Sequence, residues 1–315
     1  HTGYSGRRPD GGHVHANIPV GPSGLVEAIN LLATEPALLA AIALILGATI
    51  GSFLNVVCLR LPRMMQQEWK AQCCELLETP LEPAEPFNLA FPPSRCPQCG
   101  HSIRAWENIP VISYMLLRGR CAGCQTSISM RYPLVETACG LLSAVVAWHF
   151  GPTWQCAAAL GLTWALLTLS IIDFDTQLLP DDITLPLLWA GLLLALGDIF
   201  VPLRDAVIGA AAGYLILWCV YWLFKLATGR EGMGYGDFKL LAALGAWMGW
   251  QAIPQIILLS SMTGALFGIA MIIFRGRDRQ IPMPFGPYLA TAGWISLLWG
   301  SEISAWYAGV SGLAP

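Results

Sequence analysis

Long uncharged runs, mostly apolar, alternate with short charged segments along most of this chain. Six runs contain no Asp, Glu, Lys or Arg, and they lie at Ala37–Leu59, Thr137–Ile172, Ile183–Gly197, Ala206–Phe224, Leu240–Phe274 and Gln280–Ser301. A helix of about 20 residues crosses the hydrocarbon core of a bilayer. The two longest runs, of 36 and 35 residues, have room for two helices each and carry breakers near their middles, Gly151-Pro152 in one and Pro254 after Gly249 in the other. The pattern therefore predicts an all-α polytopic membrane protein with about eight transmembrane helices.

Composition agrees with this fold class, since 55% of the residues are apolar and only 12% are charged. The charged share is about half that of a soluble domain. This composition excludes a soluble enzyme, a disordered chain and a secreted disulfide scaffold. An outer-membrane barrel is excluded as well, because its strands would show alternating segments of about ten residues.

One sizeable segment, at 60–133, is polar and carries eight Lys or Arg and six Glu. We expect it to be an aqueous loop domain between the first two membrane helices. The expected division is an N-terminal tail at 1–36, a first transmembrane helix at 37–59, the loop domain at 60–133, a seven-helix membrane core at 134–301 and a C-terminal tail at 302–315. No cleavable signal peptide is expected, because the first apolar run is too long for one.

The distribution of basic residues predicts the orientation of the chain in the membrane. With eight alternating helices, 14 of the 17 Lys and Arg residues fall on one side, and only Arg7, Arg8 and Arg204 fall on the other. Basic residues concentrate in cytoplasmic loops. We therefore expect the loop domain at 60–133 to be cytoplasmic and the N-terminal tail to be non-cytoplasmic.

Two C-x-x-C pairs in the loop domain predict a metal site, and their cysteines are Cys96, Cys99, Cys121 and Cys124. Each pair can place two thiolates on one side of a tetrahedral ion, and Gly100 and Gly123 give the turns backbone freedom. Two disulfides or four inert thiols are the alternatives, but disulfides seldom persist in the reducing cytosol. We expect a structural zinc ion, because four thiolates complete its coordination.

The other candidate ligands have simpler interpretations. His101 follows the first pair, but a shell of four thiolates has no place for it. Four further cysteines lie in or beside apolar runs and are expected to be small buried residues; they are Cys58, Cys139, Cys156 and Cys219.

Two aspartates at the ends of membrane helices are candidates for catalysis. Asp173 ends the 36-residue run, and Asp237, in Gly234-Tyr-Gly-Asp237, precedes the 35-residue run. Two crossings separate them, so both arrive at the same cytoplasmic face and can meet. Paired carboxyl groups that share a proton perform aspartic proteolysis. The alternative, that both side chains extend to water or cap helices, is equally compatible with the spacing.

Other charged groups near these positions are expected to have ordinary roles. Asp181 or Asp182 is expected to cap the next helix, and Asp175 to be solvated. Lys239 is expected to reach the lipid headgroups rather than pair with a carboxylate.

Ordered motifs link these residues to a known family. They are Gly51-Ser-Phe-Leu-Asn55 with Arg60-Leu-Pro62, Pro93-Ser-Arg-Cys96 through His101, Asn108-Ile-Pro110 before Arg118-Gly-Arg-Cys121, Arg131-Tyr-Pro133 with Glu136, Ile172-Asp173-Phe-Asp175 through Asp181, Gly232-Met-Gly-Tyr-Gly-Asp237-Phe-Lys239, and Pro284-Phe-Gly-Pro-Tyr288. With them the chain resembles the bifunctional prepilin leader peptidases of type IV pilus and type II secretion systems, which belong to the GxGD aspartic proteases of membranes.

The resemblance implies that Asp173 and Asp237 are the catalytic pair. The implied substrate is a prepilin or pseudopilin with a short basic leader, cut at the cytoplasmic face of the bacterial inner membrane. It also implies that S-adenosylmethionine then methylates the new N-terminal residue, with the loop domain taking part. Membrane lipid is the other expected partner, nucleic acid is not expected, and no residue is assigned to the methyl donor.

Two other classes of function compete with this interpretation. A transporter or channel with a regulatory zinc loop predicts ionisable groups near helix midpoints, whereas these carboxylates cluster at one interface. A non-catalytic assembly subunit predicts that either aspartate can be lost without effect.

Overall fold

The computed structural model describes residues 32–80, 87–275 and 283–311. Eight long helices make up most of this part: α2 (Pro36–Leu76), α4 (Arg131–Phe150), α5 (Trp154–Thr176), α6 (Asp181–Ala195), α7 (Leu203–Thr228), α8 (Tyr235–Met248), α9 (Ile253–Arg275) and α10 (Gly286–Ser311). Short helical turns occur at η1 (Ala105–Asn108), α3 (Ile112–Leu116) and η2 (Trp250–Ala252). The described residues contain no β-strand, which confirms the predicted all-α class.

Within the described residues each predicted apolar run contains helix, and both long runs divide where the sequence indicates. Helix α4 ends at a glycine cap, Gly151, and α8 ends at Gly249. Five helices in the described ranges are long and apolar enough to cross a membrane on their own, namely α2, α4, α5, α7 and α9 with η2. Helices α6 and α8 have only 15 and 14 residues, and α10 is kinked at Trp299. The chain is a multi-pass membrane protein.

Two helices extend beyond their expected ends. Helix α2 continues past Leu59 to Leu76, because the segment after Pro62 contains neither Gly nor Pro and is rich in good helix formers. Helix α10 continues through Ser311, into the segment expected to be a C-terminal tail. Of the two expected tails, residues 1–31 and 312–315 lie outside the described part of the chain.

Helix α8 lies at the centre of the bundle, packed against α6, α7, α9 and α10. Ten of its 14 residues are buried, among them Phe238, Leu241 and Leu244. Helices α7 and α9 instead expose apolar side chains such as Leu223 and Ile273, as expected of a surface facing lipid. Because α8 is enclosed by protein, it needs neither the length nor the apolar surface of a helix that faces lipid.

Small residues allow α7 to approach α8 closely. A Cβ atom at Gly209 would collide with the carbonyl oxygen of Gly245, and one at Gly245 with that of Gly209. Such contacts between backbones are typical of helix pairs in membranes. They fix the position of α8, and with it the position of Asp237.

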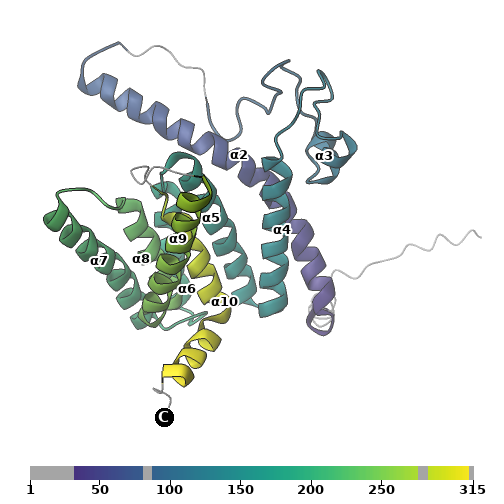
Figure 1. Ribbon diagram of the computed structural model, residues 1–315. Helices are drawn as coiled ribbons and strands as arrows, with labels where there is room; N and C mark the ends of the chain where they lie inside the picture. Colours follow the sequence, from purple (N-terminus) through teal and green to yellow (C-terminus); the bar gives the residue numbers. More distant parts are fainter. Residues whose placement is uncertain (1–31, 81–86, 276–282, 312–315) are drawn as a thin grey trace, which may run out of the picture.

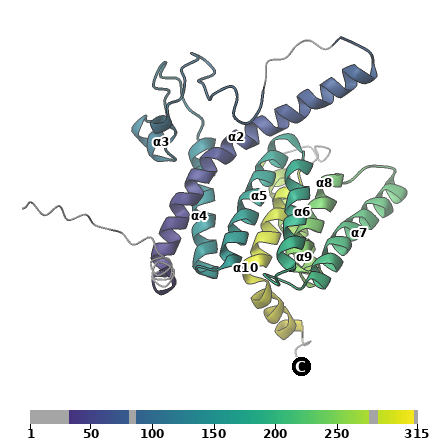
Figure 2. The ribbon, with the colours of Figure 1, turned by 180° about the vertical axis from the view of Figure 1, so that it is seen from behind.

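One end of the bundle gathers segments that are far apart in the sequence. Helix α5 ends there, and α6, α8 and α10 begin there (Figure 1). The C-terminal part of α2 crosses over this end, and the segment that contains α3 lies at the same end (Figure 2). All the candidate functional residues therefore lie toward one end of the molecule.

Candidate active site and metal centre

Asp173 lies in the last turns of α5, where it is only 5% exposed. Its Oδ2 atom accepts a hydrogen bond of 2.9 Å from the backbone N–H of Gly286, the first residue of α10. The helix ends four residues later at Gln177, whose left-handed backbone (φ 57°) reverses the chain. Asp173 is thus held in the interior and does not extend to water.

Asp237 lies in the first turn of α8 and is 6% exposed. Its backbone N–H bonds to the carbonyl oxygen of Gly234, the residue that caps the helix. The Oδ1 atom is buried and has no hydrogen-bond partner among the described residues. A buried carboxyl oxygen without a partner is costly unless a proton or a ligand is supplied to it.

The two carboxyl groups lie close enough for the charge of Asp173 to act on Asp237. Leu179, in the turn after α5, packs against both Gly236 and Gly286. A Cβ atom at Gly236 would lie 2.7 Å from the Cβ of Leu179, and a Cβ atom at Gly286 would lie 3.2 Å from its Cδ2. Two carboxylates at short range repel each other, so ionising both costs more than ionising one. The arrangement has the chemistry of an acid and a base side by side.

Gly286 is the site residue to which the sequence assigned no role. A Cβ atom at this position would lie 2.6 Å from Asp173 Oδ2, so only glycine lets the backbone N–H reach the carboxylate. The signal was the motif Pro284-Phe-Gly-Pro-Tyr288, whose paired prolines around a glycine indicate a tight turn. Its position beside Asp173, 113 residues away, follows only from the fold.

The other charged groups around the site depart from expectation. Lys239 Nζ contacts Asp181 at 2.6 and 2.7 Å instead of reaching lipid headgroups. Asp175 pairs with Arg131 at the start of α4, so it is not simply solvated. The cap of α6 is Pro180, which makes no side-chain cap bond, so the expected capping by Asp181 or Asp182 is wrong. Both stand in the first turn of α6, where the helix dipole favours negative charge.

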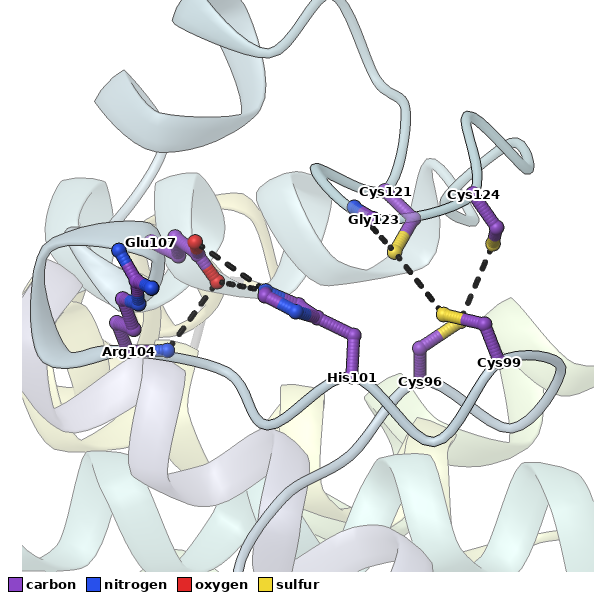
Figure 3. A network of polar contacts seen from close by, with 8 residues as sticks. All are labelled: Cys96, Cys99, His101, Arg104, Glu107, Cys121, Gly123 and Cys124. Carbon is purple, nitrogen blue, oxygen red and sulfur yellow. Dashed lines mark hydrogen bonds and ion pairs between the residues drawn. The ribbon is translucent and has the colours of Figure 1, made fainter.

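The four predicted ligand cysteines meet at one point in the segment 87–130, which we call the cysteine module. Cys96 Sγ lies 3.8 Å from Cys124 Sγ, Cys99 Sγ lies 3.9 Å from Cys121 Sγ, and all four sulfur atoms lie within 4.8 Å of one another (Figure 3). A tetrahedral ion with metal–sulfur bonds of about 2.3 Å requires sulfur–sulfur distances of about 3.8 Å. The cluster can therefore hold a metal ion.

The ionisation of these thiols also favours a cation. Hydrogen bonding with Thr126 lowers the pKa of Cys124 to about 6. The backbone N–H of His101 lowers the pKa of Cys99, but the thiol of Cys124, desolvation and the thiols of Cys96 and Cys121 together outweigh it and raise this pKa to about 12. A cation bound between the sulfur atoms would offset the negative charge of thiolates at this site.

The two C-x-x-C turns repeat the same backbone design. In each, the first cysteine bonds through its N–H to the carbonyl five residues later, at His101 in one turn and Thr126 in the other. Its carbonyl accepts the N–H four residues later, from Gly100 or Gln125, which both have positive φ. In the second turn the left-handed residue is thus Gln125 rather than Gly123.

Gly123 has a steric role instead. A Cβ atom there would lie 3.1 Å from His101 Cβ and 3.4 Å from Cys99 Sγ, so glycine lets the two turns approach each other. His101 itself turns away from the sulfur atoms, and its Nε2 contacts the Glu107 carboxylate at 3.1 Å (Figure 3). The prediction that His101 is not a ligand agrees with this geometry.

Three of the four cysteines expected to be buried are so, namely Cys58, Cys139 and Cys156. Cys219 is exposed on α7, because that helix turns much of its surface outward.

Hydrogen bonds attach the cysteine module to α2 and α4, and Ser52 of α2 makes one of them with the side-chain oxygen of Asn108. Arg60 of α2 donates to the carbonyl oxygens of Asn88 and Pro92 at 2.9 and 2.7 Å. Glu136 of α4, a buried carboxylate, accepts the backbone N–H of Val111 at 2.7 Å. These contacts are to α2 and α4, whereas the aspartate pair is carried by α5 and α8.

Comparison with known proteins finds two family models along the chain. The bacterial peptidase A24 N-terminal domain matches residues 45–150, and the type IV leader peptidase family matches residues 160–269. The first match contains the cysteine module and the second contains both aspartates. No solved structure matches the chain.

Curated relatives are similar over almost their whole length. The chain is 60% identical over 280 residues to the prepilin leader peptidase/N-methyltransferase of Stutzerimonas stutzeri, covering 89% of this chain and 97% of that protein. It is 55% identical over 285 residues to the protein of that name from Pseudomonas aeruginosa, covering 90% and 98%. The similarly named protein of Aeromonas hydrophila is 59% identical over 260 residues, covering 82% and 90%.

Proposed function

Because the chain belongs to the type IV leader peptidase family, we propose that it is a membrane aspartic endopeptidase that removes the leader from type IV prepilins or type II secretion pseudopilins. The observation that carries this proposal is the pair of buried carboxyl groups, Asp173 and Asp237, at one end of the bundle. Peptide hydrolysis needs one carboxylate to take a proton from water and one carboxylic acid to donate a proton to the scissile carbonyl.

The environment of the pair fits this chemistry. The N–H of Gly286 fixes the orientation of Asp173, and the free Oδ1 of Asp237 is available for a proton, the attacking water or the substrate. Gly236 has no side chain, so the residue next to Asp237 takes up little space. We assign the acid and base roles to the pair and not to either residue, because the geometry does not distinguish the two carboxyl groups by role.

The proposed location is the bacterial inner membrane, with the aspartate pair and the loop domain at 60–133 facing the cytoplasm. The bias of 14 basic residues against three supports this orientation. This orientation is consistent with the structure, in which one end of the bundle holds the end of α5, the starts of α6, α8 and α10, and the cysteine module (Figures 1 and 2). A prepilin held in the membrane by its own apolar helix would present its scissile bond at this interface.

The metal of the cysteine module is proposed to be zinc, held by Cys96, Cys99, Cys121 and Cys124. Four thiolates at tetrahedral spacing select zinc among the common cellular ions and complete its shell. Its role would be structural, because the module has little apolar content with which to fold alone.

A second reaction is proposed after cleavage, namely methylation of the new N-terminal amine. The names of the relatives include N-methyltransferase. S-adenosylmethionine would supply the methyl group when bound. Cleavage must come first, because the nitrogen to be methylated is an amide until the leader is removed and is a poor nucleophile in that form.

The test is to incubate the purified protein in lipid nanodiscs with a prepilin and to measure the mass of the product's N-terminal peptide. Loss of the leader is expected, followed by the gain of one methyl group when S-adenosylmethionine is added. A transporter or an assembly subunit would leave the prepilin intact, and this outcome would overturn the proposal.

A further inference from the structure

A groove of about 290 Å³ lies between the C-terminal part of α2 and the turn that joins α5 to α6. Glu68, Trp69 and Gln72 of α2 line one wall, and Leu179 and Asp182 line the other. Figure 1 shows the two segments at the end of the bundle where α2 crosses over the other helices. This groove could not be anticipated from the residue pattern, which predicts a loop domain where its α2 wall lies.

Leu179 connects the groove to the aspartate pair. This side chain lines the groove, and it also packs against the backbone at Gly236 and at Gly286, within 2.7 and 3.2 Å of where a Cβ atom would stand. Gly286 in turn holds Asp173 through its N–H. A single side chain therefore stands between the groove and two glycines, Gly236 beside Asp237 in α8 and Gly286, which bonds to Asp173.

The charged groups of the groove are acidic. Asp181 also lines the groove, but its carboxylate forms an ion pair with Lys239. Glu68 and Asp182 form no ion pair with any residue that the structure describes. Trp69 is 45% exposed, which leaves part of its ring accessible. Free carboxylates beside an accessible indole ring form a suitable site for a Lys or Arg side chain, whose stem packs on the ring while its charge meets the carboxylates.

We propose that this groove binds a cationic segment of the substrate, the leader peptide next to the scissile bond, with Glu68 and Asp182 as its specificity-determining residues. This inference rests on the proposed function, since it takes the occupant to be the part of the substrate that is removed. A chain in the groove passes Leu179 and reaches the aspartate pair, so the groove positions the bond to be cut. Glu68 and Asp182 select the leader by charge, whereas the pair performs the chemistry.

The first measurement separates binding from cleavage. In full-length protein carrying Asp173→Asn and Asp237→Asn, we expect a fluorescent basic leader peptide to bind about tenfold more weakly after Glu68→Lys and Asp182→Lys are added, a difference of about 1.4 kcal/mol. Glu75→Lys is the matched control, because Glu75 is exposed on the same helix and does not line the groove. Equal affinity in all three proteins would overturn the proposal.

The second measurement uses the protein with its aspartates intact and two prepilins that differ only in the charge of the leader. For the basic substrate, Glu68→Lys with Asp182→Lys is expected to raise KM about tenfold with kcat unchanged. For a leader in which Gln replaces Lys and Arg, the same variant should raise KM much less, because the charges that the new lysines repel are absent. An equal loss on both substrates would overturn the groove proposal, while absence of cleavage in the unmodified protein would overturn the proposed function instead.

Discussion

The backbone N–H of Gly286 donates to Asp173 Oδ2 over 2.9 Å, although 113 residues separate the two. This bond joins the start of α10 to the end of α5 in the protein interior. It exists because position 286 has no side chain: a Cβ atom there would lie 2.6 Å from the same carboxylate oxygen. The orientation of one member of the pair therefore depends on a glycine in another helix.

Substitution of this glycine tests that dependence. Gly286→Ala is expected to lower kcat for leader cleavage about a hundredfold, because displacement of a reacting group by about 1 Å has an effect of this size. The KM for substrate should change little, since Gly286 contacts Asp173 and does not line the groove. Steady-state cleavage of a synthetic prepilin in nanodiscs measures both constants.

Gly161→Ala is the matched control. Gly161 lies in the same helix as Asp173, and a Cβ atom there would meet nothing within 4 Å. Alanine is also the better helix former, so this variant should be as stable as the parent or more so. Equal activity of both variants and the parent would show that the Gly286 contact has no part in catalysis.

The aspartate pair gives a second prediction. Asp173→Asn and Asp237→Asn should each reduce cleavage by ~10³-fold or more, because an amide can neither share nor transfer the proton. Insertion in the membrane and thermal stability should be nearly unchanged, since Asn conserves the volume of each side chain. Mass spectrometry of the product measures cleavage, and a single variant that cleaves at the parent rate would exclude that residue from the catalytic pair.

The sequence could predict the parts of this site that depend on local patterns of residues. The uncharged runs predict the helices, and counting the crossings between Asp173 and Asp237 predicts that they share an end of the bundle. The C-x-x-C spacing predicts a four-sulfur cluster whose atoms indeed lie within 4.8 Å of one another. In each case the information lies within one segment or in the order of segments.

Contacts between residues far apart in the sequence were not predicted, or were predicted wrongly. Lys239 was expected at the headgroups, but Asp181, which it contacts at 2.6 Å, is 58 residues away and is brought close only by the packing of α6 on α8. The hydrogen bond from Gly286 is another such contact. The uncharged run predicts an end of the first helix at Leu59, but α2 continues to Leu76, because charged residues outside the membrane are compatible with further helical turns.

The cysteine module gives a third prediction. The purified protein should contain one zinc ion per chain, and Cys96→Ser with Cys121→Ser should contain none, because each substitution removes a ligand from a different C-x-x-C pair. Prolonged treatment with a strong chelator should remove the metal from the parent as well. Elemental analysis by mass spectrometry measures the content.

His101→Ala serves as the comparison for these variants. Its ring contacts Glu107 and not the sulfur atoms, so the variant should keep its metal. An intact zinc content in the double serine variant, or its loss in His101→Ala, would contradict the proposed set of ligands.

The two proposed activities should separate by region, which is the fourth prediction. The module is attached to α2 and α4 through Arg60 and Glu136, whereas the aspartate pair and its supports belong to α5, α8 and α10. Loss of metal should therefore impair methylation by at least about tenfold while cleavage falls less. Rates of leader release and of methyl gain on one prepilin give this comparison directly.

The order of the two reactions follows from the state of the nitrogen. In Asp173→Asn no free amine is produced, so a full-length prepilin should be neither cut nor methylated. The same variant should still methylate a pilin whose leader was removed beforehand, because its cysteine module is intact. Mass spectrometry of both substrates, with and without S-adenosylmethionine, reports each product. A methylated prepilin that keeps its leader would contradict the order, and failure on the cleaved pilin would place Asp173 in both reactions.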